Sequence, residues 1–155
     1  MNRMILSILI CLLTINGYSQ HGVKFLEGDL QSALNVARQQ KKMVFVDVYT
    51  SWCGPCRGDI PHLKDAYSAY HAKGFDIVSV SIDADKGQWK KALEQEQMPW
   101  LQVCDKGEGF DGFIVKKYGI SGVPSSFLID PQGKIVLTNA RGGWLDTKLK
   151  ELFEK

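Results

Sequence analysis

The stretch Val44–Arg57, with the sequence VFVDVYTSWCGPCR, constrains the fold more than any other part of the chain. Its first residues are β-branched and aromatic, which is typical of a strand that is buried on both faces. Two cysteines follow, Cys53 and Cys56, separated by Gly54 and Pro55. If a helix begins at this pair, its free N–H groups and the positive end of its dipole favour a thiolate over a thiol. The stretch therefore predicts a strand-to-helix turn that carries a reactive pair of cysteines.

The composition is that of one ordinary globular domain. The chain has 155 residues, of which 45% are hydrophobic and 23% charged, and this length is sufficient for one core. The formal net charge of +2 does not favour nucleic acid or an acidic membrane surface as a partner. Because we find no linker and no internal repeat, we expect a single domain over residues 20–155.

The first 19 residues differ from the rest of the chain. Arg3 carries a positive charge, and residues 4–13 are almost wholly apolar. Such a stretch is shorter than the roughly 20 residues of a membrane-spanning helix, and it is typical of a secretory signal peptide. Gly17 and Ser19 are the small residues expected before a cut at Gln20. We therefore predict an extracytoplasmic protein, periplasmic or secreted, with no membrane span after cleavage. A buried N-terminal helix and an uncleaved anchor are the alternatives.

The cysteine count favours chemistry over structure. Cleavage after residue 19 would remove Cys11 and leave Cys53, Cys56 and Cys104. A structural disulfide framework in an oxidising compartment uses an even number of cysteines. An odd number that includes a C-x-x-C spacing favours redox or metal chemistry, with an inert structural pair as a further alternative. Zinc would need two more ligands, and the remaining cysteine and histidines form no second paired spacing.

Hydrophobic periodicity and turn signals predict alternating helices and strands. The expected helices are 29–40, 53–73, 86–97, 111–118 and 145–154, and the expected strands are 43–49, 77–82, 101–104, 127–129 and 134–138. Pro61 falls inside the second helix and should bend it. Residues 130–133 are expected to form a turn between the last two strands. This order favours an α/β sheet with helices on both faces.

The strand followed by Trp52–Cys56 resembles the active site of the thioredoxin family. Four further positions agree with that family: Asp47, where thioredoxins carry a buried acid; Pro61, where their long helix bends; Gly119–Pro124, which resembles the segment with their cis-proline; and Gly142, which matches a glycine near their active site. The resemblance implies a thioredoxin fold, with a central mixed β-sheet flanked by helices.

One segment is longer than in thioredoxin itself. Residues 83–118 form an insertion before the expected cis-proline segment, and Asp59 lies three residues after Cys56. Both features are similar to the TlpA/ResA-like thiol-disulfide oxidoreductases, an exported branch of the family. The resemblance implies an enzyme that exchanges disulfides with protein partners and is served by an upstream redox partner. It implies no metal and no organic cofactor, because the cysteine pair is itself the redox group.

The resemblance also implies a role for each residue of the pair. Cys53 would attack a partner disulfide, and we expect it to be partly exposed with a lowered pKa. Cys56, more buried, would resolve the mixed disulfide. Asp47 would accept a proton from Cys56, since burial raises the pKa of a carboxyl group; the alternative is a solvated Asp47 at the sheet edge. Ser79 is expected where thioredoxins often carry a lysine near this acid.

Three residues are expected to contact the partner. Trp52 would form a platform beside the cysteines, with simple packing as the alternative. The resemblance implies a cis peptide bond between Val123 and Pro124, with a free backbone edge on which a partner peptide can pair as an added strand. The alternative is an ordinary trans turn.

The residues around the pair are expected to tune it. Gly54-Pro55 is the dipeptide of reducing thioredoxins, and it favours the reducing direction. Asp59 either tunes the two cysteines or is a solvated acid near a helix start. Cys104 is either a buried small hydrophobic residue or an accessible thiol.

Two other functions are alternatives to thiol-disulfide exchange. The cysteine pair would suit Cu(I) or Zn(II) in a thiolate metal-binding module. The second alternative function is that of a peroxidase of the related peroxiredoxin type. We expect the protein to be a monomer.

Overall fold

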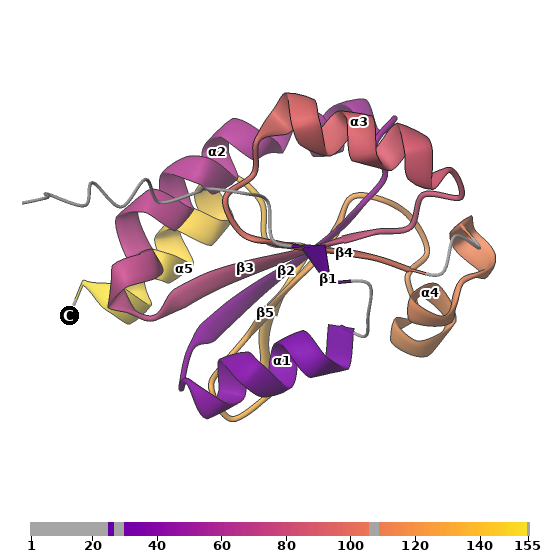
Figure 1. The fold of residues 1–155 in the computed structure, drawn as a ribbon. Helices are drawn as coiled ribbons and strands as arrows, with labels where there is room; N and C mark the ends of the chain where they lie inside the picture. Colours follow the sequence, from indigo (N-terminus) through magenta and orange to yellow (C-terminus); the bar gives the residue numbers. More distant parts are fainter. Residues whose placement is uncertain (1–24, 27–29, 106–108, 155) are drawn as a thin grey trace, which may run out of the picture.

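A computed structural model of the chain describes residues 25–26, 30–105 and 109–154. They form one six-stranded sheet with helices on both faces (Figure 1). In the order in which they lie side by side, the strands are β1 (Phe25–Leu26), β4 (Leu101–Cys104), β3 (Phe75–Ser81), β2 (Met43–Tyr49), β5 (Ser125–Ile129) and β6 (Ile135–Thr138). The predicted α/β architecture is confirmed. The predicted signal peptide, residues 1–19, lies outside the described residues.

The middle of the sheet is formed by β2. This strand is parallel to β3 and antiparallel to β5, while β4 is parallel to β3, β1 is parallel to β4 and β6 is antiparallel to β5, so the sheet is mixed. All seven residues of β2 are buried, as its β-branched and aromatic run predicts. A polar side chain on β2 is therefore shielded from water whichever face it points to.

Two layers of helices cover the sheet. One face is covered by α2 (Gly54–Tyr70), α3 (Lys86–Glu96) and α5 (Gly143–Phe153), and the other by α1 (Leu30–Gln39) and α4 (Phe113–Tyr118). Figure 1 shows α2 and α3 above the sheet and α1 below it. We call the first of these the α2 face. Because residues of a strand alternate between faces, the side chain of Asp47 points to the α2 face together with Phe45 and Tyr49.

The insertion predicted over residues 83–118 adds to both layers and to the sheet. It contributes α3 on the α2 face, β4 beside β3, and a short 3-10 helix, η2 (Gly109–Asp111), followed by α4 on the opposite face. The predicted helices and strands are all present, with ends that differ by a few residues. The two-residue strand β1 was not expected, because two residues are too few to show a periodic pattern.

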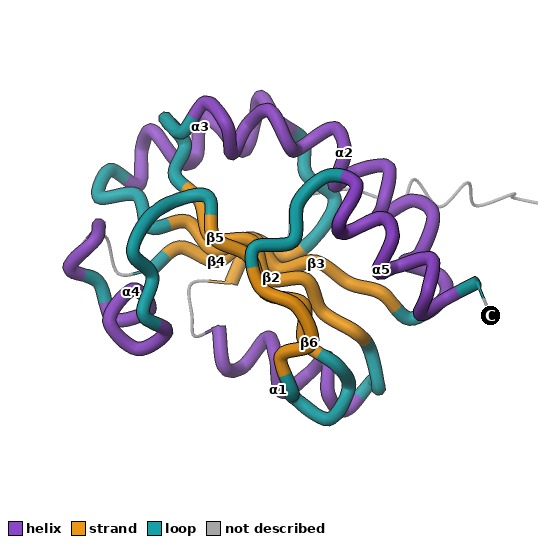
Figure 2. Tube along the Cα trace, turned by 180° about the vertical axis from the view of Figure 1, so that it is seen from behind, coloured by secondary structure: helices purple, strands orange, loops and turns teal. Residues whose placement is uncertain are grey.

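The ends of α2 and α3 show why the boundaries fall where they do. α2 continues through Pro61 and is extended by the 3-10 helix η1 (His71–Lys73), which ends at Gly74 with φ +101°. Glycine takes this left-handed conformation without the steric cost of a Cβ atom. α3 ends at Glu96, and the residue that caps it, Gln97, is also left-handed with φ +47°. The helix thus ends before Pro99. At the other end of α2, the chain passes from β2 into the helix through a short loop, which Figure 2 shows from behind.

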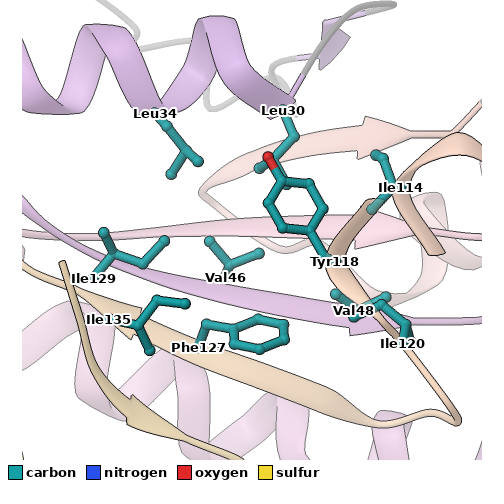
Figure 3. Close-up of a pocket in the computed structure, with 10 residues that line it drawn as sticks. All are labelled: Leu30, Leu34, Val46, Val48, Ile114, Tyr118, Ile120, Phe127, Ile129 and Ile135. Carbon is teal, nitrogen blue, oxygen red and sulfur yellow. The ribbon is translucent and has the colours of Figure 1, made fainter. Parts of the chain in front are cut away.

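A small cavity of about 70 Å³ lies between the sheet and the helices α1 and α4 (Figure 3). Its walls include Leu30 and Leu34 of α1 and Val46 and Val48 of β2, and the hydroxyl group of Tyr118 is the polar group among the lining side chains. Its lining includes Ile135 of β6, which is 48% exposed, so the space is not sealed from solvent. We assign the space to imperfect packing of the core.

Candidate active site

The change from β2 to α2 positions the two cysteines. Cys53 is the N-cap residue of α2, in an extended conformation, and it is joined to Cys56 by a disulfide bond. The backbone N–H of Cys56 donates to Sγ of Cys53 at 3.1 Å. The sulfur of Cys53 therefore takes the place that a capping oxygen has in other helices, at the positive end of the helix dipole.

Cys53 is less accessible than expected. The prediction that it is partly exposed is wrong, because it is only 6% exposed, close to the 4% of Cys56. Cys56 lies on the buried side of α2 with Ile60 and Leu63, which follow at helical spacing, and the disulfide draws the side chain of Cys53 towards this core. Trp52, directly before Cys53, is 65% exposed.

Asp47 lies under this helix and is 9% exposed. Burial raises its pKa from the usual value of 3.8 to about 7, although the positive charge of Arg141 and a hydrogen bond from Ser79 lower it. The negative charge of Asp59 raises the pKa further. The alternative of a solvated Asp47 at the sheet edge is wrong. At neutral pH this carboxyl group is balanced between its two protonation states.

Ser79 lies directly opposite Asp47 on β3, as expected. Its hydroxyl group donates to Oδ2 of Asp47 at 3.4 Å and accepts a hydrogen bond from Nε1 of Trp100 at 2.8 Å. Both Ser79 and Trp100 are buried. Because a hydroxyl group has a single proton, the indole N–H of Trp100 directs that proton towards Asp47. The insertion thus reaches Asp47 through Ser79, and the sequence analysis missed Trp100.

Arg141 is a charged residue that the sequence analysis missed. It lies in the loop between β6 and α5, and its guanidinium group forms an ion pair with the carboxylate of Asp59 on α2. It also donates to the carbonyl oxygen of Pro55 at 3.0 Å. Arg141 precedes Gly142, the glycine already matched to one near the thioredoxin active site, so the sequence did carry a signal for this position.

Asp83 holds the loop that precedes the cysteines. Its carboxylate accepts hydrogen bonds from the backbone N–H of Ser51 at 2.9 and 3.1 Å and from the hydroxyl group of Ser51 at 2.8 Å. The hydroxyl group of Ser81 donates to the same carboxylate at 2.7 Å. All three residues are buried. The sequence analysis missed Asp83 as well, although a carboxylate directly after a buried strand is a recognisable signal.

The peptide bond between Val123 and Pro124 is cis, and Val123 is partly buried against both cores. Cys104 is a free thiol at the end of β4 with intermediate exposure, and burial raises its pKa.

Among residues 25–26, 30–105 and 109–154, no three His, Cys, Asp or Glu side chains lie together in a way that could hold a metal ion. Within the same ranges, no helix has both the length and the apolar composition needed to cross a bilayer.

Comparison with known families decides where this chain belongs. A family model described as thioredoxin-like matches residues 40–135, which is more than half of the chain and includes Asp47, both cysteines and the cis-proline. The chain belongs to the thioredoxin-like family. The resemblance inferred from the sequence, and the thioredoxin fold that it implied, are thereby confirmed.

The chain is similar to proteins named thiol-disulfide oxidoreductase ResA. Those of Bacillus thuringiensis subsp. konkukian and Bacillus cereus are each 32% identical to it over 114 residues. These matches cover 74% of this chain but 63% of the relatives, so the chain spans less than two thirds of their length.

Solved structures agree with the same fold. The thioredoxin domain of a thiol-disulfide oxidoreductase from Bacteroides vulgatus is 36% identical, with a TM-score of 0.69 over 77% of this chain and 84% of that domain. A putative thiol:disulfide interchange protein DsbE from Chlorobium tepidum is 33% identical, with a TM-score of 0.62 over 77% of this chain and 82% of that one.

Proposed function

We propose that this protein is an exported thiol-disulfide oxidoreductase that exchanges disulfides with protein partners through Cys53 and Cys56. The observation that carries the proposal is the disulfide at the start of α2, on the same face of the sheet as a buried carboxyl group with a pKa of about 7. The similarity to relatives named thiol-disulfide oxidoreductases supports it.

The proposed reaction is a two-step exchange. In the reduced protein, the thiolate of Cys53 attacks one sulfur of a partner disulfide, forms a mixed disulfide and releases the other partner sulfur as a thiolate. Cys56 then loses its proton and attacks Sγ of Cys53. This step forms the Cys53–Cys56 disulfide and releases the second partner thiol. Two electrons have passed from the cysteine pair to the partner, and an upstream dithiol protein must return them.

Asp47 is proposed as the proton acceptor for Cys56. A general base works best when its pKa lies near the working pH, and burial raises the pKa of Asp47 to about 7. A carboxylate with its ordinary pKa would be too weak a base to accept a thiol proton efficiently at neutral pH.

The contacts with the partner are proposed to come from three residues. Trp52 offers a ring that is 65% exposed next to Cys53. Val123 and Pro124 would offer the backbone edge on which a partner peptide pairs as an added strand. The apolar and backbone character of these contacts suits protein clients of varied sequence.

The direction and the compartment are further parts of the proposal. Gly54-Pro55 favours the reducing direction, which places the reduction potential nearer to about −270 mV than to about −120 mV. Residues 1–19 would direct export and be removed, leaving residues 20–155 as the mature domain outside the cytoplasm. Equilibration with dithiol buffers of known potential measures the reduction potential, and a value near about −120 mV would contradict a reductase.

Trapping of partners tests the exchange itself. In a Cys104→Ser background, Cys56→Ser should accumulate mixed disulfides between Cys53 and client proteins, which mass spectrometry of the linked peptides detects. Cys53→Ser in the same background is the matched control and should trap nothing through position 53. If Cys56→Ser traps no partner and the unaltered protein reduces no protein disulfide, the proposal is wrong. Metal bound to the reduced protein, or rapid consumption of peroxide, would then favour the corresponding alternative.

A further inference from the structure

Arg141 makes contacts that join the C-terminal loop to the first turns of α2. It is half-buried, and its guanidinium group pairs with Asp59 and donates to the carbonyl oxygen of Pro55 at 3.0 Å. Pro55 lies between the two cysteines, so this hydrogen bond falls inside the disulfide loop itself. A planar guanidinium group can make both contacts at once, which the point charge of a lysine does less well.

The same two charged residues also act electrostatically on Asp47. Arg141 attracts its carboxylate from the loop between β6 and α5, and Asp59 repels it from α2. Of the neighbouring strands, β3 presents the hydroxyl group of Ser79, and β5 presents Ser126, whose hydroxyl group donates instead to the carbonyl oxygen of Ala140. Tyr49, two residues along β2, is also coupled electrostatically to Asp47.

We propose that Arg141 is a positioning residue of this site, which holds Asp59 and the Pro55 carbonyl at the start of α2 and, together with Asp59, sets the charge that faces Asp47. The ion pair thus acts as one unit with two opposed effects on the same carboxyl group. The kinetic consequence rests on the proposed function, because it requires Asp47 to accept a proton during exchange.

A purely structural role for the ion pair makes a different prediction. If the pair only anchored the loop to α2, then Arg141→Gln and Asp59→Asn would break the same contact and shift the pKa of Asp47 in the same direction. If the charges act on Asp47, the two variants shift its pKa in opposite directions. Loss of Arg141 removes an attraction and leaves Asp59 unpaired, which raises the pKa of Asp47; loss of Asp59 removes a repulsion and lowers it.

The test is a titration of the Asp47 carboxyl carbon by NMR in the oxidised protein, which needs no enzymatic activity. We expect Arg141→Gln to raise the midpoint by on the order of one pH unit, Asp59→Asn to lower it, and the double variant to lie between them. Arg57→Gln is the matched control. It removes the same charge from the residue next to Cys56, but Arg57 forms an ion pair with Glu96 and donates to Gln95, both on α3, so we expect no shift.

The outcomes separate the inference from the proposed function. Shifts in the same direction, no shift, or an equal shift in Arg57→Gln would overturn the inference. If Arg141→Gln does not fold, Asp59→Asn decides alone: a lower midpoint supports the inference, and an unchanged or higher midpoint contradicts it. The rate of disulfide exchange against pH should follow the same order, with a loss on the order of fivefold at pH 7 in Arg141→Gln. A wild-type protein that is inactive at every pH contradicts the proposed function and leaves the titration result standing.

Discussion

At the scale of the residue, Asp47 is notable because an ionisable side chain occupies a buried position. It lies in the middle of a strand whose seven residues are all buried, yet its side chain can ionise. Burial raises its pKa to about 7, and three neighbours modify that value: Ser79, Asp59 and Arg141. A buried carboxyl group of this kind costs stability, and groups with strongly shifted pKa values concentrate at functional sites.

The cost of Asp47 predicts how stability depends on pH. The folded-state pKa of about 7 lies above the unfolded value of about 3.8, so the folded protein holds a proton that the unfolded chain releases between these values. Ionisation of the buried Asp47 therefore costs no folding stability below about pH 4, and this cost grows as the pH rises to about 7. We expect Asp47→Asn to raise the free energy of unfolding by up to about 4 kcal/mol more at pH 8 than at pH 4. Urea denaturation at the two pH values measures this, and an equal effect at both would contradict the assignment.

Ser79 offers a second prediction at this scale. Ser79→Ala removes the hydroxyl group that donates to Asp47, so the pKa of Asp47 should rise. It also leaves the buried indole N–H of Trp100 without its partner, at a cost of about 1–3 kcal/mol. Ser126→Ala is the control, because Ser126 lies opposite Asp47 on the other neighbouring strand but bonds to Ala140. An equal change in the titration midpoint of Asp47 in both variants would show that Ser79 has no specific role.

At the scale of the element, the start of α2 is held from two sides. Asp83, after β3, fixes the loop before the cysteines, and Arg141, after β6, holds the turn that contains them. The N-terminus of a helix alone would leave this turn free to fray. Because both residues lie at ends of strands in the same sheet, the sheet positions the disulfide through them.

Removal of Asp83 should therefore loosen the loop as well as destabilise the fold. Asp83→Ala leaves the backbone N–H and hydroxyl group of Ser51 and the hydroxyl group of Ser81 without their acceptor. We expect a loss of about 2–4 kcal/mol in the free energy of unfolding, with faster hydrogen exchange at the Ser51 amide. Asp85→Ala removes the exposed cap of α3 and is the control, with a loss of about 1 kcal/mol and no change at Ser51. Equal exchange at Ser51 in the two variants would count against this role.

At the scale of the whole molecule, the insertion contributes to the sheet and to the helical layers on both of its faces. α3 extends the layer on the α2 face, β4 widens the sheet, and α4 covers the opposite face. Trp100, which belongs to the insertion, reaches Asp47 through Ser79. The insertion thus contributes one hydrogen bond to the network around Asp47.

Export is the prediction that concerns the whole chain. If residues 1–19 form a cleaved signal peptide, the protein recovered from an exporting host should begin at Gln20, which intact-mass spectrometry reads directly. Ser19→Arg places a large charged side chain at the cut and should block cleavage. Ser32→Arg, at an exposed position of α1, is the control and should be cleaved normally. Recovery of the wild-type protein with residues 1–19 attached would contradict cleavage, and its presence in the membrane fraction would support an anchor.

Most of the fold could be read from local patterns. The strand before the cysteines, the helix after them and the order of later elements follow from periodicity and turn residues, which depend on neighbours in the chain. The position of Asp47 within a buried strand follows in the same way, whereas the place of Ser79 beside it was implied by the resemblance to thioredoxins. The strand β1 could not be predicted, because a strand of two residues forms only where a neighbouring strand pairs with it.

The sequence by itself thus determined the cysteine pair, its place between a strand and a helix, and the buried acid beneath it, because each depends on spacing along the chain. The tertiary structure alone decided that Cys53 is buried, that Asp83 holds Ser51, and that Arg141 pairs with Asp59. Thirty-two residues separate the first of these pairs and 82 the second. Such contacts form only once the sheet and its helices have packed, and no local pattern encodes which side chains then meet.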